Sequence, residues 1–350
     1  MAYTDIDKPS EYFNTVTYTG TGTSPLSVTG VGFQPDFLWI KRRDSSGSHR
    51  LTDIVRGVAN HLESNNTDAE KSSSGIGSFD SDGWTFNSTG VSFNTSGGTY
   101  AGWNWLAGGT GVSNTQGTIA STVSVNTTSG FSIVSYTGTG ANATVGHGLG
   151  VAPSMLIVKN RSAVGNWRCY HKSLGETQLI RLDTTNATLT NASWNNTTPT
   201  ANVFSIGVND DVNQNGGTHI AYCFAEVKGF SKFGSYTGNG STDGTFVYLG
   251  FKPAFVIIKR SSSTGNWELF DNKRDIDNLV GHFLEANTTG AESDLSASHT
   301  PLDFLSNGFK LRNSSLTGDT NINLSGSTYI YMAFAESPFT TSTGIPTTAR

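Results

Sequence analysis

One ten-residue pattern occurs three times in this chain of 350 residues, at residues 32–41, 150–159 and 250–259. In each copy a glycine and a proline precede a short apolar run, and a lysine ends the run. Proline fixes φ and has no N–H to give to a ladder, so it suits the start of a strand. The run itself is β-branched and aromatic, which predicts a short strand buried in a sandwich core.

A second marker, Tyr-Thr-Gly-x-Gly, opens each copy at Tyr18, Tyr136 and Tyr236, and it recurs at the same two offsets as the first marker. The period is far longer than the roughly 20–50 residues of solenoid repeats. Each copy is therefore expected to be a domain with its own core. Glycine at 41 residues, with only 14% charged residues, favours many short strands and tight turns.

The predicted fold is all-β, with three tandem antiparallel β-sandwich domains. Repeat one with its leader takes residues 1–109, repeat two 131–229 and repeat three 230–339. The polar residues 110–130 are predicted to be a flexible linker, and 340–350 a polar tail. The join at 226–230 is short, which indicates that repeats two and three are docked.

Two further segments bear on the strand assignment. Residues 276–284 fit a helical stripe, whereas the matching 178–183 fit a strand, and because copies should agree we expect mainly strand. The closing segments 99–105, 218–224 and 328–334 alternate large aromatic residues with smaller ones, which predicts strands with one aromatic face.

Composition excludes several classes of function. The net charge of −5 gives no basic footprint for nucleic acid. No apolar run approaches the roughly 20 residues of a membrane span, so membrane insertion is not expected. Aromatic residues at 11% argue against disorder. The N-terminus lacks the regions of a signal peptide, which indicates synthesis in a cytoplasm.

Further motifs occur in segments 53–57, 78–83, 146–150 and 333–336. Together with Tyr-Thr-Gly-x-Gly and the strand ending in lysine, they are similar to a repeat in virion proteins of tailed bacteriophages, many from marine hosts. The resemblance covers essentially the whole chain. It implies a phage structural protein, usually labelled tail or fibre protein, with jelly-roll or lectin-like sandwiches and no transferable catalytic residues. Repeat two departs from the pattern at His171, where the other repeats have Asp53 and Asp271.

The resemblance leads to a non-enzymatic virion component, made in the host cytoplasm, that is tail-associated and binds the host surface. A capsid decoration or head-fibre protein is the alternative, supported by the absence of long heptads. A polysaccharide-cleaving tail enzyme is the outside alternative. The expected partners are other virion proteins, a host surface glycan and further copies of this chain, with a trimer favoured because the aromatic strand faces need a cover.

Ligand binding is predicted on the hairpin loops that follow Lys41, Lys159 and Lys259, because loops on a rigid sandwich can vary freely. Gly-Asn-Trp in two of the loops gives the candidate residues, Asn166 with Trp167 and Asn266 with Trp267. An aromatic face beside an amide suits a sugar. A role of both tryptophans in the core is the rival interpretation.

No catalytic residue, metal site or cofactor is predicted. The carboxylate pairs Asp80/Asp82 and Glu63/Glu70 are read as turn and surface residues rather than as a glycosidase pair. Residues 211–216 fit the first half of a calcium loop, but Tyr222 stands where the loop needs glutamate, so a turn is favoured. Cys169 and Cys223 are predicted to be buried free thiols.

Overall fold

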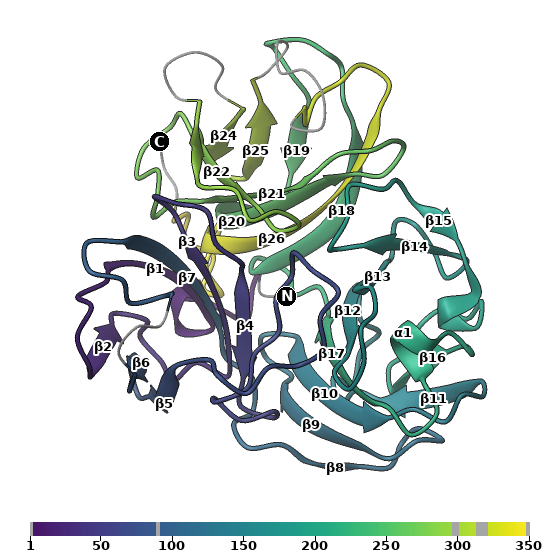
Figure 1. Ribbon diagram of the computed structural model, residues 1–350. Helices are drawn as coiled ribbons and strands as arrows, with labels where there is room; N and C mark the ends of the chain where they lie inside the picture. Colours follow the sequence, from purple (N-terminus) through teal and green to yellow (C-terminus); the bar gives the residue numbers. More distant parts are fainter. Residues whose placement is uncertain (1–2, 89–91, 296–300, 313–320, 348–350) are drawn as a thin grey trace.

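The computed structural model describes residues 3–88, 92–295, 301–312 and 321–347, and it is nearly all β-structure (Figure 1). The strands pair antiparallel in several sheets, so the predicted all-β sandwich fold is confirmed. Each repeat forms a lobe in which an inner sheet faces the middle of the molecule and a smaller outer sheet covers its far side.

Repeat one follows a short 3-10 turn, η1 (Pro9–Glu11). Its inner sheet has the strand order β1-β7-β3-β4, and its outer sheet has the order β2-β6-β5. The strands are β1 (Phe13–Thr19), β2 (Leu26–Thr29), β3 (Phe37–Arg42), β4 (Arg50–Asp53), β5 (Ile76–Asp80), β6 (Gly83–Phe86) and β7 (Thr99–Trp105).

Repeat two has the inner order β15-β14-β13-β12-β17-β10-β9-β8 and the outer pair β11-β16. Two short helices, η2 (Ala192–Trp194) and α1 (Asp210–Asn213), lie in its connections. The strands are β8 (Val112–Asn114), β9 (Ser121–Asn126), β10 (Phe131–Thr137), β11 (Ala143–Gly146), β12 (Met155–Asn160), β13 (Arg168–His171), β14 (Gln178–Arg181), β15 (Leu189–Thr190), β16 (Val203–Ile206) and β17 (Thr218–Phe224).

Repeat three has the inner order β18-β26-β20-β21-β22-β23 and the outer order β19-β25-β24. The segment 276–284, which we expected to be mainly strand, is strand only from His282 onward, in β22. Residues 276–281 form a loop before it. The strands are β18 (Ser231–Thr237), β19 (Phe246–Tyr248), β20 (Phe251–Arg260), β21 (Trp267–Asp271), β22 (His282–Glu285), β23 (Ser293–Asp294), β24 (Leu302–Leu305), β25 (Gly308–Leu311) and β26 (Thr328–Pro338).

The apolar strand that is repeated in the sequence is buried on both faces. In β3, Leu38 and Ile40 pack inside the sandwich of repeat one, whereas Phe37 and Trp39 point to the centre of the molecule. Strands β12 and β20 alternate in the same way. A continuous apolar run is what a strand covered on both faces needs. The lysine that ends each run occupies the next centre-facing position.

The centre-facing residues of all three repeats form one hydrophobic cluster, which we call the shared core. Trp105, Phe224 and Phe334, at matching positions of β7, β17 and β26, meet there. Their ring centroids are 6.3, 5.8 and 6.0 Å apart, and each pair is edge-on. Edge-to-face contacts at this spacing add to the stabilisation from burial. Each lobe therefore has its own core and also shares a fourth with the other two.

Residues 110–130 differ from the flexible linker that the sequence indicated. Strands β8 and β9 lie in this segment and extend the inner sheet of repeat two, with β9 paired to β10 over six residues. The alternating Val123 and Val125 supply the apolar face that a strand needs, and Val123 is buried. The polar composition that suggested a linker comes from the outward positions and the turns.

Residues near the start of the described chain contact repeat three and the segment that follows it. Tyr3 donates its hydroxyl to the carbonyl of Gly250 at 2.7 Å, and Asp7 accepts from Ser342 in the tail.

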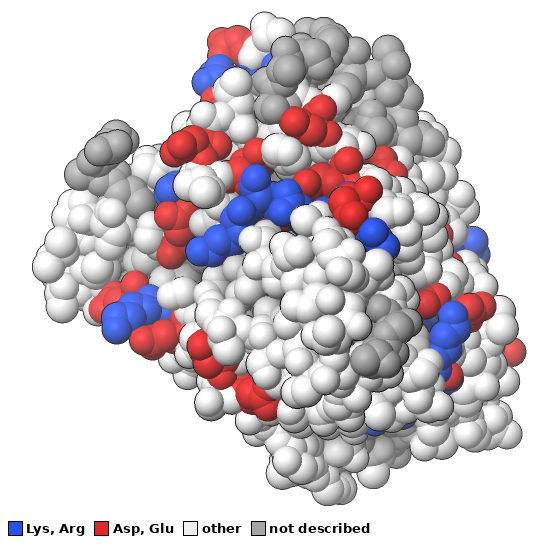
Figure 2. Space-filling model, turned by 60° about the vertical axis from the view of Figure 1, so that its left-hand side comes forward, with Lys and Arg blue, Asp and Glu red and all other residues white. Residues whose placement is uncertain are grey.

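Acidic and basic side chains occur in mixed patches on the face shown in Figure 2, and much of that face is uncharged. Among the described residues, no helix has the length and apolar character for crossing a membrane.

Candidate functional site

The two candidate tryptophans lie between repeats. Trp167 is 0% exposed and donates its indole N–H to the carbonyl of Glu63 in repeat one at 3.0 Å. Trp267 is 1% exposed and donates to the carbonyl of Arg181 in repeat two at 2.8 Å. Both rings belong to the shared core. Neither offers a face to a ligand, so the predicted sugar contact has no open surface here.

The two candidate asparagines support the same hairpins. Asn166 donates its amide to Asp183 at 2.7 Å, and Asn266 donates to Glu285 at 2.7 Å. The Asn266 carbonyl accepts from Asn287, also at 2.7 Å. Each amide joins two loops of its own repeat. The next residue in the chain, Trp167 or Trp267, then points to the neighbouring repeat.

The matching position in repeat one holds His49, and it makes the same contact. His49 is buried, and its Nε2 lies 2.9 Å from the carbonyl of Glu285 in repeat three, while Nδ1 accepts from Trp39 at 2.8 Å. These partners fix the neutral tautomer with the proton on Nε2. Each repeat thus binds the preceding one, and repeat one binds repeat three, so the three contacts close a ring.

The predicted binding loops also lie in these joints, as we call the contacts between adjacent repeats. The backbone N–H groups of Gly47, Gly165 and Gly265 each donate to a threonine carbonyl of the neighbouring repeat, at 2.9 Å in all three joints. Their backbones are therefore committed to holding the ring. One sequence signal could have indicated these joints: His49, Trp167 and Trp267 each stand eight residues after the lysine of their repeat.

The three lysines that end the repeated strand cross the same joints. Lys41 reaches the carbonyl of Gly290 at 2.6 Å, Lys159 that of Thr67 at 3.2 Å, and Lys259 that of Thr185 at 2.9 Å. Burial lowers the pKa of both Lys41 and Lys159 to about 8. The ammonium groups donate to backbone oxygens, which explains why a lysine follows every apolar run.

A buried ion pair stands beside two of the joints. Asp271 binds Arg274 at 2.6 Å and also accepts the indole N–H of Trp103 in repeat one at 3.0 Å. Asp53 pairs with Arg56 in the same way. These side chains are almost fully removed from water, where a carboxylate is stable only if it is paired and hydrogen-bonded.

His171 takes the place of the aspartate at the third joint, and its surroundings have changed with it. Its Nε2 lies 3.1 Å from the carbonyl of Tyr331 in repeat three, and its Nδ1 accepts from Ser173. The residue at the arginine position is Leu174, and Met332 replaces the cross-joint donor that Trp103 provides elsewhere. An aspartate at this position would have neither the arginine nor the side-chain donor that pairs with it in the other joints. The neutral His171 needs neither.

The rim of the joints has two charged sites and one neutral site. At one charged site Glu70 bridges Arg161 of repeat two at 2.8 Å and Arg56 of its own repeat at 3.0 Å. Glu292 bridges Arg43 of repeat one at 2.8 Å and Arg274 of its own repeat at 3.0 Å. Burial alone would raise the pKa of Glu292, but the two arginines outweigh it and hold the pKa below its usual value. At the third joint Thr188 donates to the carbonyl of Ser261 instead.

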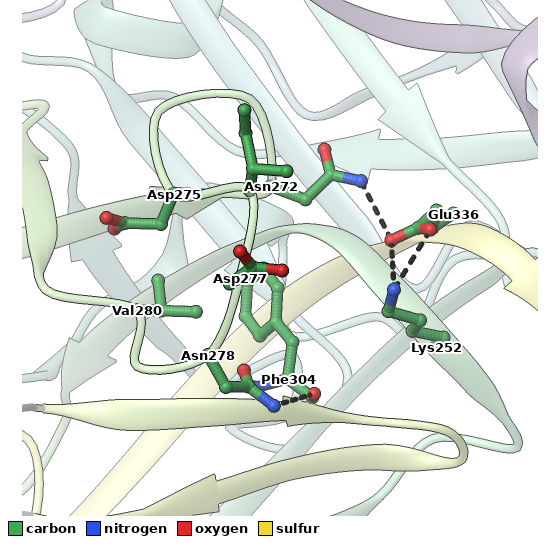
Figure 3. A pocket seen from close by; sticks show the side chains of 9 residues that line it. Lys252, Asn272, Asp275, Asp277, Asn278, Val280, Phe304 and Glu336 are labelled. Carbon is green, nitrogen blue, oxygen red and sulfur yellow. Dashed lines mark hydrogen bonds and ion pairs between the residues drawn. The ribbon is translucent and has the colours of Figure 1, made fainter. Parts of the chain in front are cut away.

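The structure shows one further candidate, a pocket of about 180 Å³ in repeat three (Figure 3). Its apolar floor comes from Val280 and Phe304, both buried. Lys252 and Glu336 form an ion pair at 3.0 Å along one side, and Asn272 donates to Glu336 at 2.9 Å. We call this the acidic pocket, because Asp275 and Asp277 also line it.

The remaining candidates have structural roles. The partial calcium motif differs from the predicted turn, because residues 210–213 form the short helix α1, in which Asp211 pairs with Arg168. The described part of the chain holds no group of three or more potential metal ligands. Cys169 and Cys223 are free and buried, which confirms that prediction.

Three β-sandwich lobes fused around a shared core define the class of protein to which this chain belongs, a compact all-β ring formed within one polypeptide. The chain belongs to the family described as Domain of unknown function (DUF7483), whose model matches residues 8–338. No curated protein matches the sequence.

Proposed function

We propose that this chain is a non-enzymatic structural component of a tailed bacteriophage particle, associated with the tail and engaged in binding the host surface. The resemblance of its motifs to phage virion repeats supplies the setting. The closed ring of three lobes is the observation that supports a structural role. Its buried lysines, ion pairs and indoles serve to hold the lobes in one orientation.

A fixed orientation matters for a virion part because the particle must present surfaces at defined positions. Each joint combines a hairpin contact, a lysine contact and a side-chain contact across the strands, and all three joints cover the shared core. A joint of this kind removes the independent lobe motion that is expected of small polar interfaces.

Host contact belongs in this proposal to the outward loops and outer sheets, and not to the hairpins after the lysines. Those hairpins are occupied in the joints. Loops on the far side of each sandwich remain free to vary without disturbing either core. A host surface glycan is the ligand class that the proposal assigns to them.

A capsid decoration protein is the second candidate, and the ring is compatible with it. A chain with three similar lobes approximates threefold symmetry, so it suits a threefold position on a shell as well as a tail tip. The argument for a homotrimer weakens, because the aromatic strand faces that needed a cover pack against one another within the chain.

Labelling of intact particles with antibodies against this chain, viewed by electron microscopy, separates the two candidates. Label on the tail, together with reduced phage adsorption when purified chain is added, supports the proposal. Label on the capsid supports the decoration role. Label on neither, or release of reducing sugars from host polysaccharide by the purified chain, contradicts the non-enzymatic virion assignment.

A further inference from the structure

The acidic pocket is built by an insertion that only repeat three carries. Matching strand pairs bring Leu51 opposite Leu62, Cys169 opposite Ile180 and Leu269 opposite Leu284. The partners are 11 residues apart in the first two repeats and 15 apart in the third, which therefore has four extra residues. The other repeats act as internal controls that fold without the insertion.

The insertion is held firmly at both ends. Asp275 accepts from the backbone N–H groups of Gly281 and His282, at 2.9 and 2.8 Å, and binds the His282 ring at 2.6 Å. Asn278 makes two bonds to the backbone of Phe304, at 2.7 and 2.8 Å. Between these two anchors lie Ile276 and Asp277, which are exposed to solvent and line the pocket.

Two aliphatic side chains of the insertion are left in water. Ile276 is 85% exposed and Leu279 is 48% exposed. In repeat one the corresponding loop packs Ile54 and Val55 against the shared core. An inserted loop that exposes aliphatic residues beside a pocket has the composition of a protein interface, in which an apolar surround encloses an anchor site.

The unpaired polar groups of the pocket are hydrogen-bond acceptors. Among the described residues, the Asp277 carboxylate has no partner, and Figure 3 shows it in the midst of the lining residues. The buried Oδ1 of Asn272 also lacks a partner in that part of the chain. Three carboxylates against the single ammonium of Lys252 leave the lining negative.

We infer that the acidic pocket receives an arginine side chain from another protein of the particle. A guanidinium has five donors and a planar fork that matches a carboxylate, and its methylene stem can lie along aliphatic side chains. Asp277 would take the guanidinium, with Ile276 and Leu279 covering the stem and the surrounding backbone. The inference deepens the proposed structural role, since a virion component must be held by its neighbours.

The test uses the full-length, isotope-labelled chain and two small probes, N-acetyl-arginine amide and its uncharged isostere N-acetyl-citrulline amide. We expect the arginine probe to shift the backbone amide resonances of residues 272–281 with a low-millimolar Kd, as suits a ligand of this size. The citrulline probe should bind at least about tenfold more weakly, because it lacks the charge.

Asp277→Asn should weaken the arginine probe by about tenfold, because it removes the charged acceptor and keeps the shape. Asp5→Asn, at another exposed carboxylate, is the matched control and should change nothing. Equal binding of both probes, shifts with methyl glucoside as large as those with arginine, no shift at about 50 mM, or full binding to Asp277→Asn would each overturn the inference. Particle labelling tests the virion role separately, so either proposal can fail alone.

Discussion

The indole N–H of Trp267 lies 2.8 Å from the carbonyl oxygen of Arg181, and this bond ties repeat three to repeat two. The same relationship joins Trp167 to Glu63 at the next joint. The Asn-Trp pair, which the sequence suggested as a ligand-binding motif, thus connects neighbouring repeats.

Trp267→Ala should lower the free energy of unfolding by about 3–5 kcal/mol, because it opens a large cavity in the shared core and removes the indole donor of the Arg181 carbonyl. Trp267→Phe keeps most of the packing and should cost less. Urea unfolding of both variants measures the difference. A value within about 0.5 kcal/mol of the wild type for Trp267→Ala would mean that the indole is not buried in solution.

Asp271→Asn should cost about 3 kcal/mol, since it removes the nearer of the two carboxylates that pair with the buried Arg274 guanidinium and leaves Glu292 as its one counter-ion. Asp44→Asn serves as the control, because Asp44 pairs with Arg42 at the surface and such pairs contribute about 0–1 kcal/mol. Equal effects of the two substitutions in urea unfolding would contradict the buried ion pair.

Acid should destabilise the ring through the buried His171. Burial lowers the pKa of His171 to about 4, against 6.5 for the exposed group. At this site the unfolded chain therefore binds more protons than the folded chain between these values, and the contribution of His171 to stability falls as the pH drops from 6.5 towards 4.

For His171 alone the loss at pH 4 is about 3 kcal/mol. His171→Gln keeps a donor for the Tyr331 carbonyl and removes the proton uptake, so its unfolding free energy should fall less over this range. Parallel pH profiles of the variant and the wild type, measured by urea unfolding from pH 7 to 4, would contradict the assignment.

Limited proteolysis should leave residues 121–126 intact in the native chain, because β9 is paired to both β8 and β10. Backbone in a sheet interior is poorly accessible to a protease. Mass spectrometry of the first fragments locates the cuts. Early cleavage inside 121–126 would restore the flexible linker that the polar composition suggested.

Much of the fold follows from local patterns. The run that ends at Lys41, its two copies and the alternation in 99–105 each specify a strand through residue type and period, which depend on nearby residues alone. The buried free state of Cys169 and Cys223 follows equally from the apolar strands that carry them.

The joints could not be predicted from local patterns, because they depend on which faces of different repeats meet in the folded chain. An asparagine and a tryptophan after a glycine look alike whether the indole covers a sugar or a neighbouring lobe. A usable signal did exist at His171, Leu174 and Met332, three departures from the repeat that are explained only if they meet at one joint. The acidic pocket had a signal as well, the four extra residues before Leu284.

Differential scanning calorimetry of the full chain tests the central claim most directly, namely that the three repeats form one closed ring around a shared core. If they do, the calorimetric enthalpy of unfolding should equal the van't Hoff enthalpy, in a single transition. A calorimetric enthalpy about three times the van't Hoff value, or three resolved transitions, would show three independent domains and contradict the account.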